Sequence, residues 1–495
     1  MSIALIALAL ATSPPATDRD TSAWWATTTV LSNDAMEGRD TGSVAYERAA
    51  KIVAARLAAA GVKPAGDNGS WFQRVPMEQV ALPKAGVHIA VDTTPLAFLH
   101  DITVEPTVDM PTKLDATIAF RGYCGAAVLG DVRGKVVVCW GTHRPGLPDA
   151  AARLAAVRTA GAAGIVTVAD PGFAVEPPRW PFAYARSVWL AGTTPRHEAM
   201  LVAALNVAAL GRVVAGSSHD AAALTVAGTM GEPLPSFDAP GRFVASFAPT
   251  RKSLTASNII GLLPGTDAAL ANQHIVLSAH LDGYGFGEPV DGDALYNGTL
   301  DDAAYVALLI QLAERRHGHG YRRPVMLAAF TGEEKGLLGA RWFVAHPTVP
   351  LATIAADINL DQLRPIFPLD LLTVHALDDT TLGNDARAVA GEMGIAVQKD
   401  PEPERNLLRR ADQWPVLQAG IPATAFVFGY RPGGPSERVY RHWYVTGYHK
   451  PQDDIAQPMD WTAAARFNTF FYRLVDRVAD QPAVPAWQPG STLKP

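Results

Sequence analysis

The sequence lacks several features that would restrict its function at once. It contains two cysteines in 495 residues, Cys124 and Cys139, which are too few for a tetrathiolate metal site. In an oxidising compartment these thiols could pair, but two unlinked buried thiols fit the sequence equally well. Beyond the first residues, no run reaches the roughly 18 uninterrupted apolar residues that a membrane helix needs, so no membrane span is predicted.

Blocks of like charge are also absent. Lysine and arginine number 42, aspartate and glutamate 48, and the formal net charge is −6. Without a basic block, neither nucleic acid nor an anionic membrane surface is expected as the main partner. Oligomeric state cannot be predicted. The hydrophobic fraction of 48% is ordinary for a globular protein, and the length predicts two or three domains.

Two common hydrolase motifs are missing. The chain has neither the HExxH pair of many zinc peptidases nor the G-x-S-x-G turn that presents a nucleophilic serine. The segment GYGFG at 283–287 superficially resembles a nucleotide-binding loop, but its glycine spacing is wrong. Neither a serine hydrolase nor a nucleotide-binding protein is therefore predicted.

The N-terminal residues favour export. An apolar run at 3–11 is followed by small residues, with plausible cleavage after Ala11 or Ala16. No Lys or Arg precedes this run, so a frayed N-terminus or a start codon placed slightly late is the alternative. We expect residues 1–18 to be a signal peptide and the mature protein to be periplasmic or secreted.

The middle of the chain has the pattern of a small α/β domain. Residues 134–140 and 164–170 are compact apolar strands, and the alanine-rich segments 150–164 and 196–210 are predicted helices. No cluster of titratable side chains occurs there, so no chemistry is assigned to this region.

The remaining segments alternate between strand and helix, which predicts an α/β fold with a mostly parallel central sheet and helices on both faces. The expected strands are 274–280, 324–330, 354–361 and 421–428. The expected helices are 43–61, 301–316, 333–346, 382–394 and 461–479.

Metal-ligand side chains follow several of these strands. His280 ends one strand, Glu333 and Glu334 follow the next, and Asp361 ends a third. Because ligands collect beyond the carboxyl ends of strands in open α/β sheets, these side chains should meet at one edge. Asp301 opens a predicted helix, where its carboxylate also suits the helix dipole.

His449, in GYHKPQDD, completes the set of ligand-type residues. Each residue alone has an ordinary structural explanation, such as helix capping or a solvated turn. Their coincidence at one sheet edge favours a metal site instead. Two imidazoles and three carboxylates suit two zinc ions, and the unassigned Glu333 beside a ligand suits a general base.

The order and context of these residues resemble metallopeptidase family twenty-eight, the dizinc aminopeptidases. The matching segments are SAHLD, NGTLDDA, FTGEEKGLLGA, NLD and YHKPQDD, which cover roughly 255–460. The resemblance implies a zinc-peptidase-like three-layer sandwich interrupted by a protease-associated domain. Its parts are expected at 19–95 and 241–485 (peptidase), 96–240 (protease-associated insertion) and 486–495 (C-terminal tail).

The resemblance also implies a role for each residue. Asp301 would bridge two zinc ions, with His280 and Asp361 completing one ligand set and Glu334 and His449 the other. Glu333 would carry the proton from water to the leaving amine. Asp282 would orient the His280 imidazole, and Tyr448 matches a position that donates to the oxyanion in some members, although a packed aromatic is an equal reading.

The chain departs from the family pattern at two positions. Tyr305 replaces a small residue on the first turn of a helix, and Gln362 stands where methionine is common after the aspartate. Neither change removes a ligand, but both leave the shape of the substrate pocket open. Cobalt or manganese could replace zinc.

The leading hypothesis is an aminopeptidase that acts on peptides. The alternatives are a carboxypeptidase or dipeptidase of the same architecture, with Arg409, Arg410 or Arg431 binding the substrate carboxylate, a single-zinc glutaminyl cyclase, or a non-catalytic receptor-like scaffold. The complete ligand set and the presence of Glu333 favour catalysis.

Overall fold

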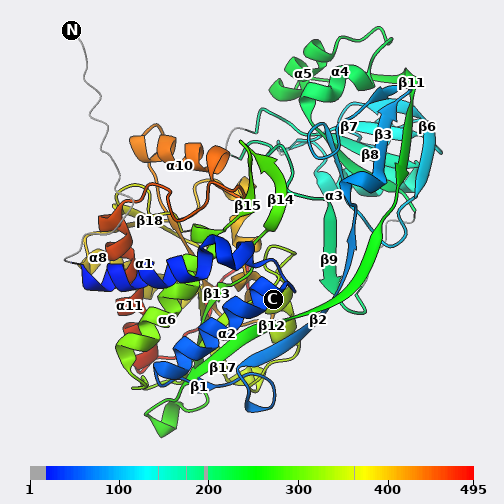
Figure 1. Ribbon diagram of the computed structural model, residues 1–495. Coiled ribbons are helices and arrows are strands. Elements are labelled where there is room, and N and C mark those ends of the chain that lie inside the picture. Colours follow the sequence, from blue (N-terminus) through cyan, green and yellow to red (C-terminus); the bar gives the residue numbers. More distant parts are fainter. Residues whose placement is uncertain (1–17, 143, 174–175, 194–198, 362) are drawn as a thin grey trace. The chain divides into compact units, whose positions relative to one another are not determined.

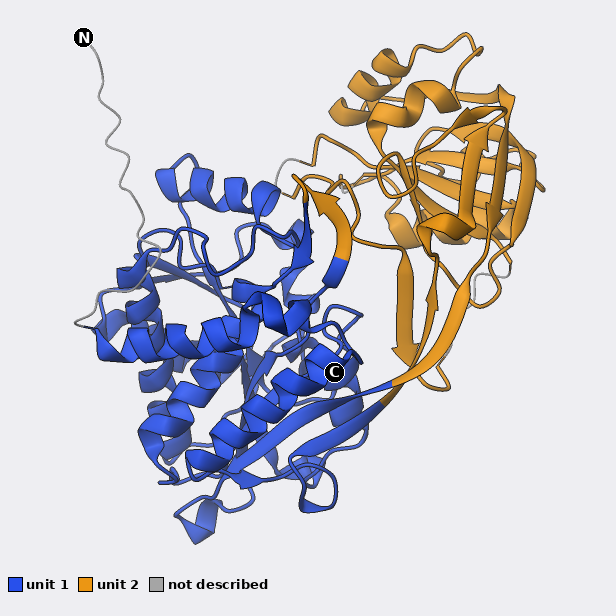
Figure 2. Cartoon of the chain, viewed as in Figure 1, with its two compact units in different colours: residues 1–75, 255–286, 293–495 blue, residues 76–254, 287–292 orange. Residues whose placement is uncertain are grey.

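The computed structural model describes residues 18–142, 144–173, 176–193, 199–361 and 363–495. The chain forms two compact units (Figure 2): unit 1 comprises Met1–Val75, Thr255–Phe286 and Asp293–Pro495, and unit 2 comprises Pro76–Leu254 and Gly287–Gly292. Unit 2 thus begins before, and ends after, the insertion predicted at 96–240, whose relation to a protease-associated domain stays a prediction. The predicted signal peptide lies outside the described residues, apart from Asp18.

The central sheet of unit 1 has a parallel core, as the sequence predicts. Its parallel strands, in spatial order, are β20 (Ala423–Thr424), β17 (Ile354–Asn359), β13 (His274–His280) and β16 (Val325–Phe330). Strand β12 (Thr250–Leu263) pairs with β16 in the antiparallel direction, and β1 (Lys63–Pro64) and β2 (Phe72–Ala81) lie beside β12. Strand β16 is buried along its whole length, which explains its uninterrupted apolar sequence.

Helices cover both faces of this sheet. One group packs together and rests on β13 through α6 (Figure 1). Its members are α1 (Arg19–Ser32), α2 (Val44–Ala59), α6 (Ala304–Arg316), α8 (Thr381–Glu392) and α11 (Trp461–Asp480). On the other face, α7 (Leu338–Ala345) and α9 (Gln413–Gln418) pack on each other, and Phe343 and Leu417 join Val276 and Met326 in one buried cluster.

Several details of unit 1 differ from the sequence prediction. The helix predicted at 301–316 begins only at Ala304, and Asp301 and Asp302 before it have non-helical backbone conformations. The helix predicted at 333–346 begins only at Leu338, because Gly336 and Leu337 have positive φ values of 107° and 60° that interrupt helical geometry. The strand predicted at 421–428 is divided between β20 and β21 (Phe426–Phe428). Helix α10 (Pro435–Thr446) was not predicted.

Strand β21 belongs to a small separate sheet of unit 1. It pairs with β18 (Leu371–Val374) in the antiparallel direction, and β18 pairs with β19 (Ala396–Gln398) in parallel. A further hairpin joins β14 (Gly285–Val290) and β15 (Asp293–Tyr296).

Unit 2 contains a mixed sheet with its own core. Its strands, in spatial order, are β4 (Thr94–Pro95), β3 (Val87–Val91), β11 (Ser236–Phe247), β6 (Lys113–Arg121), β7 (Val136–Trp140), β8 (Gly164–Val168), β10 (Leu201–Leu205) and β5 (Ile102–Val104). Its helices are α3 (Ala150–Thr159), α4 (Leu210–Val213) and α5 (Ala221–Met230). Strand β9 (Arg186–Leu190) pairs with the end of β2.

The helix predicted at 196–210 is wrong at Leu201–Leu205, which form strand β10, whereas Val207–Ala209 form a short 3-10 helix and Leu210 begins α4. Residues 196–198 lie outside the described part. Strand β10 pairs with β8 in parallel and with β5 in the antiparallel direction. Its residues alternate between buried and half-buried, a period of two that the repeated alanines conceal in the sequence. The open question about the cysteines is resolved, because Cys124 and Cys139 form a disulfide.

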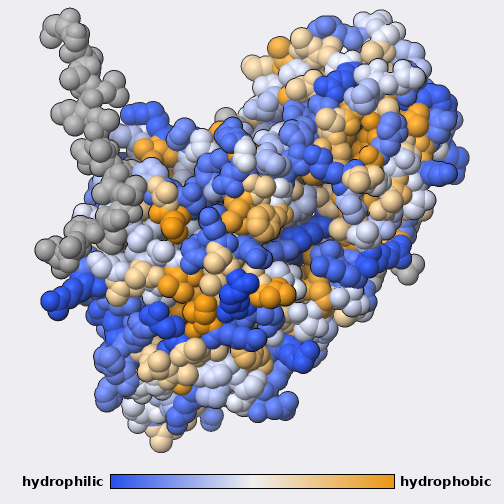
Figure 3. All heavy atoms as spheres, viewed as in Figure 1, coloured by the Kyte–Doolittle hydropathy of each residue, from blue (hydrophilic) through white to orange (hydrophobic). Residues whose placement is uncertain are grey.

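On the face drawn in Figure 3, hydrophobic residues are dispersed in small groups among hydrophilic ones. Among the described residues, none of the helices combines the length and apolar character needed to cross a bilayer.

We predict that Asp357→Asn stabilises unit 1 above neutral pH. Asp357 in β17 is fully buried and accepts a hydrogen bond from Ser278, and burial raises its pKa to about 7. Because the unfolded carboxyl ionises near pH 3.8, the folded state binds more protons between these values, and stability falls as pH rises from about 4 to about 7. Each pKa unit corresponds to about 1.4 kcal/mol, so the loss is on the order of 1–4 kcal/mol.

Thermal unfolding of wild type and variant at pH 5 and pH 8 tests this prediction. The uncharged amide should raise the unfolding midpoint more at pH 8 than at pH 5. An equal effect at both values would contradict it.

Candidate metal centre

The predicted ligand residues of three strands meet at one edge of the unit 1 sheet. In the parallel register, His280 of β13 lies opposite Phe330, the last residue of β16, and Ser278 lies opposite Asn359, the last residue of β17. The segments that follow β16 and β17 carry the glutamate pair and Asp361, so all of these side chains leave the sheet at its carboxyl edge.

Five side chains form two groups of potential metal ligands that share Asp301. The first donor group is His280, Asp301 and Asp361, and the second is Asp301, Glu334 and His449; within each group the ligand atoms lie within 4.8 Å of one another. Asp301 Oδ1 is 3.3 Å from His280 Nε2, and its Oδ2 is 3.4 Å from His449 Nε2. One carboxylate therefore faces both groups with different oxygens.

Glu333 lies beside the first donor group. Its Oε2 is 3.9 Å from His280 Nε2, the same distance that separates this nitrogen from Asp361 Oδ1. Its backbone N–H donates to Asp282 Oδ1 over 3.1 Å.

The two histidines present Nε2 to the site because other groups hold Nδ1. His280 Nδ1 lies 3.0 Å from the backbone oxygen of Asp282, whose carboxylate is 3.9 Å away and instead accepts from the Glu333 N–H and the Thr41 hydroxyl. Asp282 thus contacts His280 through its carbonyl group. His449 Nδ1 lies 2.6 Å from the Tyr284 hydroxyl. A proton on Nδ1 leaves the Nε2 lone pair available to a metal.

The segment that carries Asp301 is fixed by hydrogen bonds to buried side chains. The backbone N–H groups of Leu300 and Asp301 donate to the two oxygens of Asp453 over 2.9 and 3.0 Å. The neighbouring Asp302 accepts from the backbone N–H of His280 over 3.0 Å, which ties this segment to the end of β13. Burial raises the pKa of Asp453 to about 6.

Arg39 supports the same segment from the N-terminal part of the chain. Its fully buried guanidinium donates to the carbonyl groups of Leu281, Asn297 and Gly298 over 2.7–2.8 Å. The side chain therefore links the loop after β13 to the loop before α6.

A second buried arginine, Arg364, lies against the shared carboxylate. Its Nη2 is 3.2 Å from Asp301 Oδ2, and its guanidinium lies 4.5 Å from the centre of the Trp443 ring. Burial raises the pKa of Asp301, but Arg364 and the two histidines outweigh this and hold it well below its ordinary value.

Burial and neighbouring negative charges disfavour the ionised form of the other carboxyl groups of the site. Burial raises the pKa of Glu333 well above its ordinary value, and Asp361 and Glu334 raise it further against the opposing effect of His280. Burial, followed by the charge of Asp301, likewise raises the pKa of Glu334. Burial also raises the pKa of Asp412 well above its ordinary value. The two buried carboxylate oxygens of this residue have no hydrogen-bond partner among the described residues.

The donor set fits divalent cations. Imidazole and carboxylate donors suit zinc, and a carboxylate that faces two donor groups suits a pair of ions about 3.5–4 Å apart. A small cavity of about 10 Å³ borders Asp301, Glu334 and His449, together with Tyr284 and Tyr296. This volume is close to the roughly 10–15 Å³ that a single water molecule requires.

Tyr448 packs next to His449, with ring centres 3.8 Å apart, and its hydroxyl accepts a hydrogen bond of 3.2 Å from Arg410. Of the three arginines considered for carboxylate binding, Arg410 is therefore the one beside the metal centre. Arg431 is exposed.

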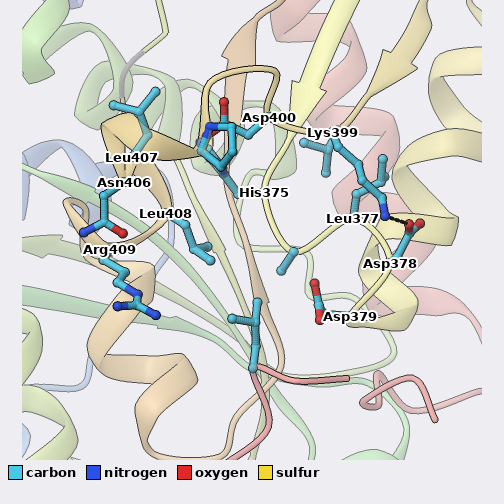
Figure 4. A pocket seen from close by; sticks show the side chains of 14 residues that line it. His375, Leu377, Asp378, Asp379, Lys399, Asp400, Asn406, Leu407, Leu408 and Arg409 are labelled. Atoms are coloured by element: carbon cyan, nitrogen blue, oxygen red, sulfur yellow. Dashed lines mark ion pairs between the residues drawn. The ribbon is translucent and has the colours of Figure 1, made fainter. Parts of the chain in front are cut away.

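Arg409 instead lines a separate cavity of about 290 Å³, which includes none of the predicted ligands (Figure 4). This cavity is formed by parts of 374–379 and 399–409 and by Leu493, and an ion pair between Lys399 and Asp378 crosses one side of it.

The structure describes one of the two residues that depart from the family pattern. Tyr305 is buried in the helical layer, where its ring packs edge-on against Phe467, and the neighbouring Ala304 carbonyl accepts a hydrogen bond from Trp24. Its ring thus fills core space between helices. Gln362 lies outside the described residues.

Several residues of the site were missed at the sequence level. Tyr284, Arg364 and Asp453 each contact a ligand residue that is distant from them in sequence, namely His449 for Tyr284 and Asp301 for Arg364 and Asp453. The buried Asp412 acts on Glu333 through its charge. Only Asp453 carried a usable signal, since it belongs to the YHKPQDD segment that contains His449.

Comparison with known proteins agrees with this geometry. Residues 258–475 match the model of peptidase family M28, which confirms the family resemblance. A protein of Pyrenophora teres f. teres named "Probable zinc metalloprotease" is 25% identical over 240 residues, covering 46% of this chain and 50% of its own. The "Alkaline phosphatase isozyme conversion protein" of Escherichia coli K12 is 31% identical over 179 residues, covering 33% and 50%. The chain spans about half the length of these curated relatives.

Solved structures share the fold. An aminopeptidase from Aneurinibacillus sp. strain AM-1 superimposes with a TM-score of 0.64 at 16% identity, covering 96% of this chain and 97% of its own. The zinc aminopeptidase BSAP from Bacillus subtilis gives a TM-score of 0.59 at 16% identity, covering 93% and 95%. At these identities the similarity establishes the mixed α/β fold alone.

We predict that Asp301→Ala loses bound metal, because the variant removes the one carboxylate that both donor groups share. Elemental analysis after gel filtration in zinc-containing buffer should show strongly reduced zinc content. Asp293→Ala, which changes an exposed aspartate in β15, should retain the wild-type content. Full metal occupancy in Asp301→Ala would contradict the role of Asp301 as a ligand in both donor groups.

Proposed function

We propose that this chain, whose residues 258–475 belong to peptidase family M28, is a two-metal exopeptidase that hydrolyses the N-terminal peptide bond of peptides. The observation that carries the proposal is the pair of donor groups that share Asp301, with Glu333 3.9 Å from His280 Nε2. His280, Asp301 and Asp361 would hold one ion, and Asp301, Glu334 and His449 the other. Zinc is the proposed metal, with cobalt or manganese as possible replacements.

The metals, when bound, supply Lewis acidity to an attacking water and to the substrate carbonyl group. Glu333 would accept a proton from this water and transfer it to the leaving amine. Its position beside the first donor group, 3.9 Å from His280 Nε2, suits a group that alternates between base and acid. Tyr448, adjacent to His449, would donate to the developing oxyanion.

The charge of the site favours a free α-ammonium group. Glu333 lies beside the first donor group but is not needed as a ligand, so its carboxyl group could contact a substrate. When ionised, this carboxylate would attract a positively charged N-terminus and would repel a substrate carboxylate.

A panel of peptides tests the proposal directly. Zinc-loaded protein should cleave peptides with a free N-terminus, including those with an amidated C-terminus, and should leave N-acetylated peptides intact. Release of C-terminal residues from N-acetylated peptides would instead identify a carboxypeptidase. Absence of cleavage from every peptide, in protein that contains metal, would favour a binding scaffold.

Arg410 is the observation that keeps the carboxypeptidase or dipeptidase alternative in view. Its guanidinium donates to the Tyr448 hydroxyl, so a planar cation able to bind a carboxylate lies near the metal centre. For a carboxypeptidase or dipeptidase, Arg410→Gln should lower activity toward peptides with a free C-terminal carboxylate far more than toward the same peptides with an amidated C-terminus. For an aminopeptidase, any change caused through Tyr448 should be equal for the two peptides.

Export from the cytoplasm is proposed as well. The disulfide between Cys124 and Cys139 is typical of proteins in oxidising compartments, and it agrees with the apolar N-terminal run. Detection of the processed protein in a periplasmic or culture fraction would test this location.

We predict that Glu333→Gln retains both metal ions but lowers kcat by about 10²–10⁴-fold, because the proton carrier is lost while the ligands remain. Glu404→Gln, a change at an exposed position, serves as the matched control and should leave kcat unchanged. Steady-state kinetics with aminoacyl anilides, alongside metal analysis, provide the measurement. Near-normal turnover by Glu333→Gln would show that Glu333 is not the proton carrier.

A further inference from the structure

The side chain of Tyr284 joins two loops that are distant in sequence. Its hydroxyl lies 2.6 Å from Nδ1 of His449, and the two rings are tilted by 43° with centres 4.6 Å apart. Tyr284 follows β13, whereas His449 follows α10. The same tyrosine borders the small cavity next to Asp301 and Glu334.

The Tyr284 ring is itself held from other sides. Tyr296 stacks on it with ring centres 6.0 Å apart, and the Lys335 ammonium lies 5.0 Å from its centre. Lys335 is the residue after the ligand Glu334, and its Nζ is also 3.4 Å from Asp40 Oδ1 and from the Gly283 carbonyl oxygen. The loop of Glu334 and the loop of His449 therefore meet through Tyr284.

We propose that Tyr284 is a positioning residue that fixes His449, and through it the second donor group, for metal binding. The inference rests on the proposed two-metal function. His449 can bind a metal through Nε2 only when Nδ1 carries the proton, and the Tyr284 oxygen is placed to accept that proton in a hydrogen bond. Loss of the oxygen would free the imidazole to rotate.

The first donor group does not depend on this contact. His280 Nδ1 is held by the backbone oxygen of Asp282, which no side-chain substitution removes. Substitution of Tyr284 should therefore affect the two metal positions unequally, and this inequality distinguishes positioning from a general loosening of the site.

The test compares full-length wild type, Tyr284→Phe and Tyr296→Phe by zinc titration against a chromogenic chelator. The Phe variant of Tyr284 keeps the stacked ring and removes only the hydroxyl group, and the Phe variant of Tyr296 removes a hydroxyl from the neighbouring ring of the same cavity. Tyr296→Phe should bind each of the two ions with the same affinity as the wild type does. Tyr284→Phe should bind the first ion normally and the second about 10–100-fold more weakly, the range observed for loss of a group that supports a metal-bound histidine.

Two further measurements separate positioning from structural damage. Thermal unfolding of chelator-treated protein should give the same midpoint for Tyr284→Phe and wild type. Cobalt-loaded Tyr284→Phe should show altered visible absorption from the second ion alone, and added zinc should restore peptidase activity.

Each remaining outcome would overturn the inference. Wild-type affinity for both ions in Tyr284→Phe would show that the hydroxyl has no positioning role. Equal weakening of both ions, with a lower midpoint for the metal-free protein, would show a general structural effect. A wild-type chain that binds one ion at saturating zinc would refute the two-metal function itself, which is a distinct result.

Discussion

The concentration of negative charge around Asp301 is the constraint on which the centre depends. Several carboxylates are buried within a few ångströms of one another, although isolated buried charges are strongly unfavourable. Arg364 compensates the shared carboxylate directly, at 3.2 Å from Asp301 Oδ2. The raised pKa values of Glu333 and Glu334 show that the protein's own cations leave the rest uncompensated. Divalent cations would supply the missing positive charge, and the donor atoms form two groups, each with its ligand atoms within 4.8 Å of one another.

This charge can be held in place because the loops that bear it are tied down by backbone groups. Asp453 accepts from two consecutive N–H groups of the Asp301 segment, and Arg39 donates to three carbonyl groups of the adjoining loops. Such contacts need no metal, so much of the geometry is present before ions bind. Preorganised ligands lose less conformational freedom on binding, which strengthens metal affinity.

The sequence allowed the donor set to be predicted, but not its surroundings. His280 and Asp361 end buried strands, and parallel register brings strand ends together, so local sequence was sufficient. Tyr284 and Arg364 act through contacts between loops that are remote in sequence, and no local pattern marks such partners. The prediction for segment 196–210 failed for another reason. Alanine favours helix over strand, but pairing with β8 and β5 overrides this propensity in β10.

The two donor groups are chemically similar but physically unequal. His280 and Asp361 are both buried, whereas Glu334 and His449 are only partly so. The first group is oriented by a backbone carbonyl, and the second by the side chain of Tyr284. Greater solvent access lowers the cost of withdrawing an ion into water, and a side-chain support is less rigid than a backbone one. A metal ion held by the second group would therefore be expected to exchange more readily than one held by the first.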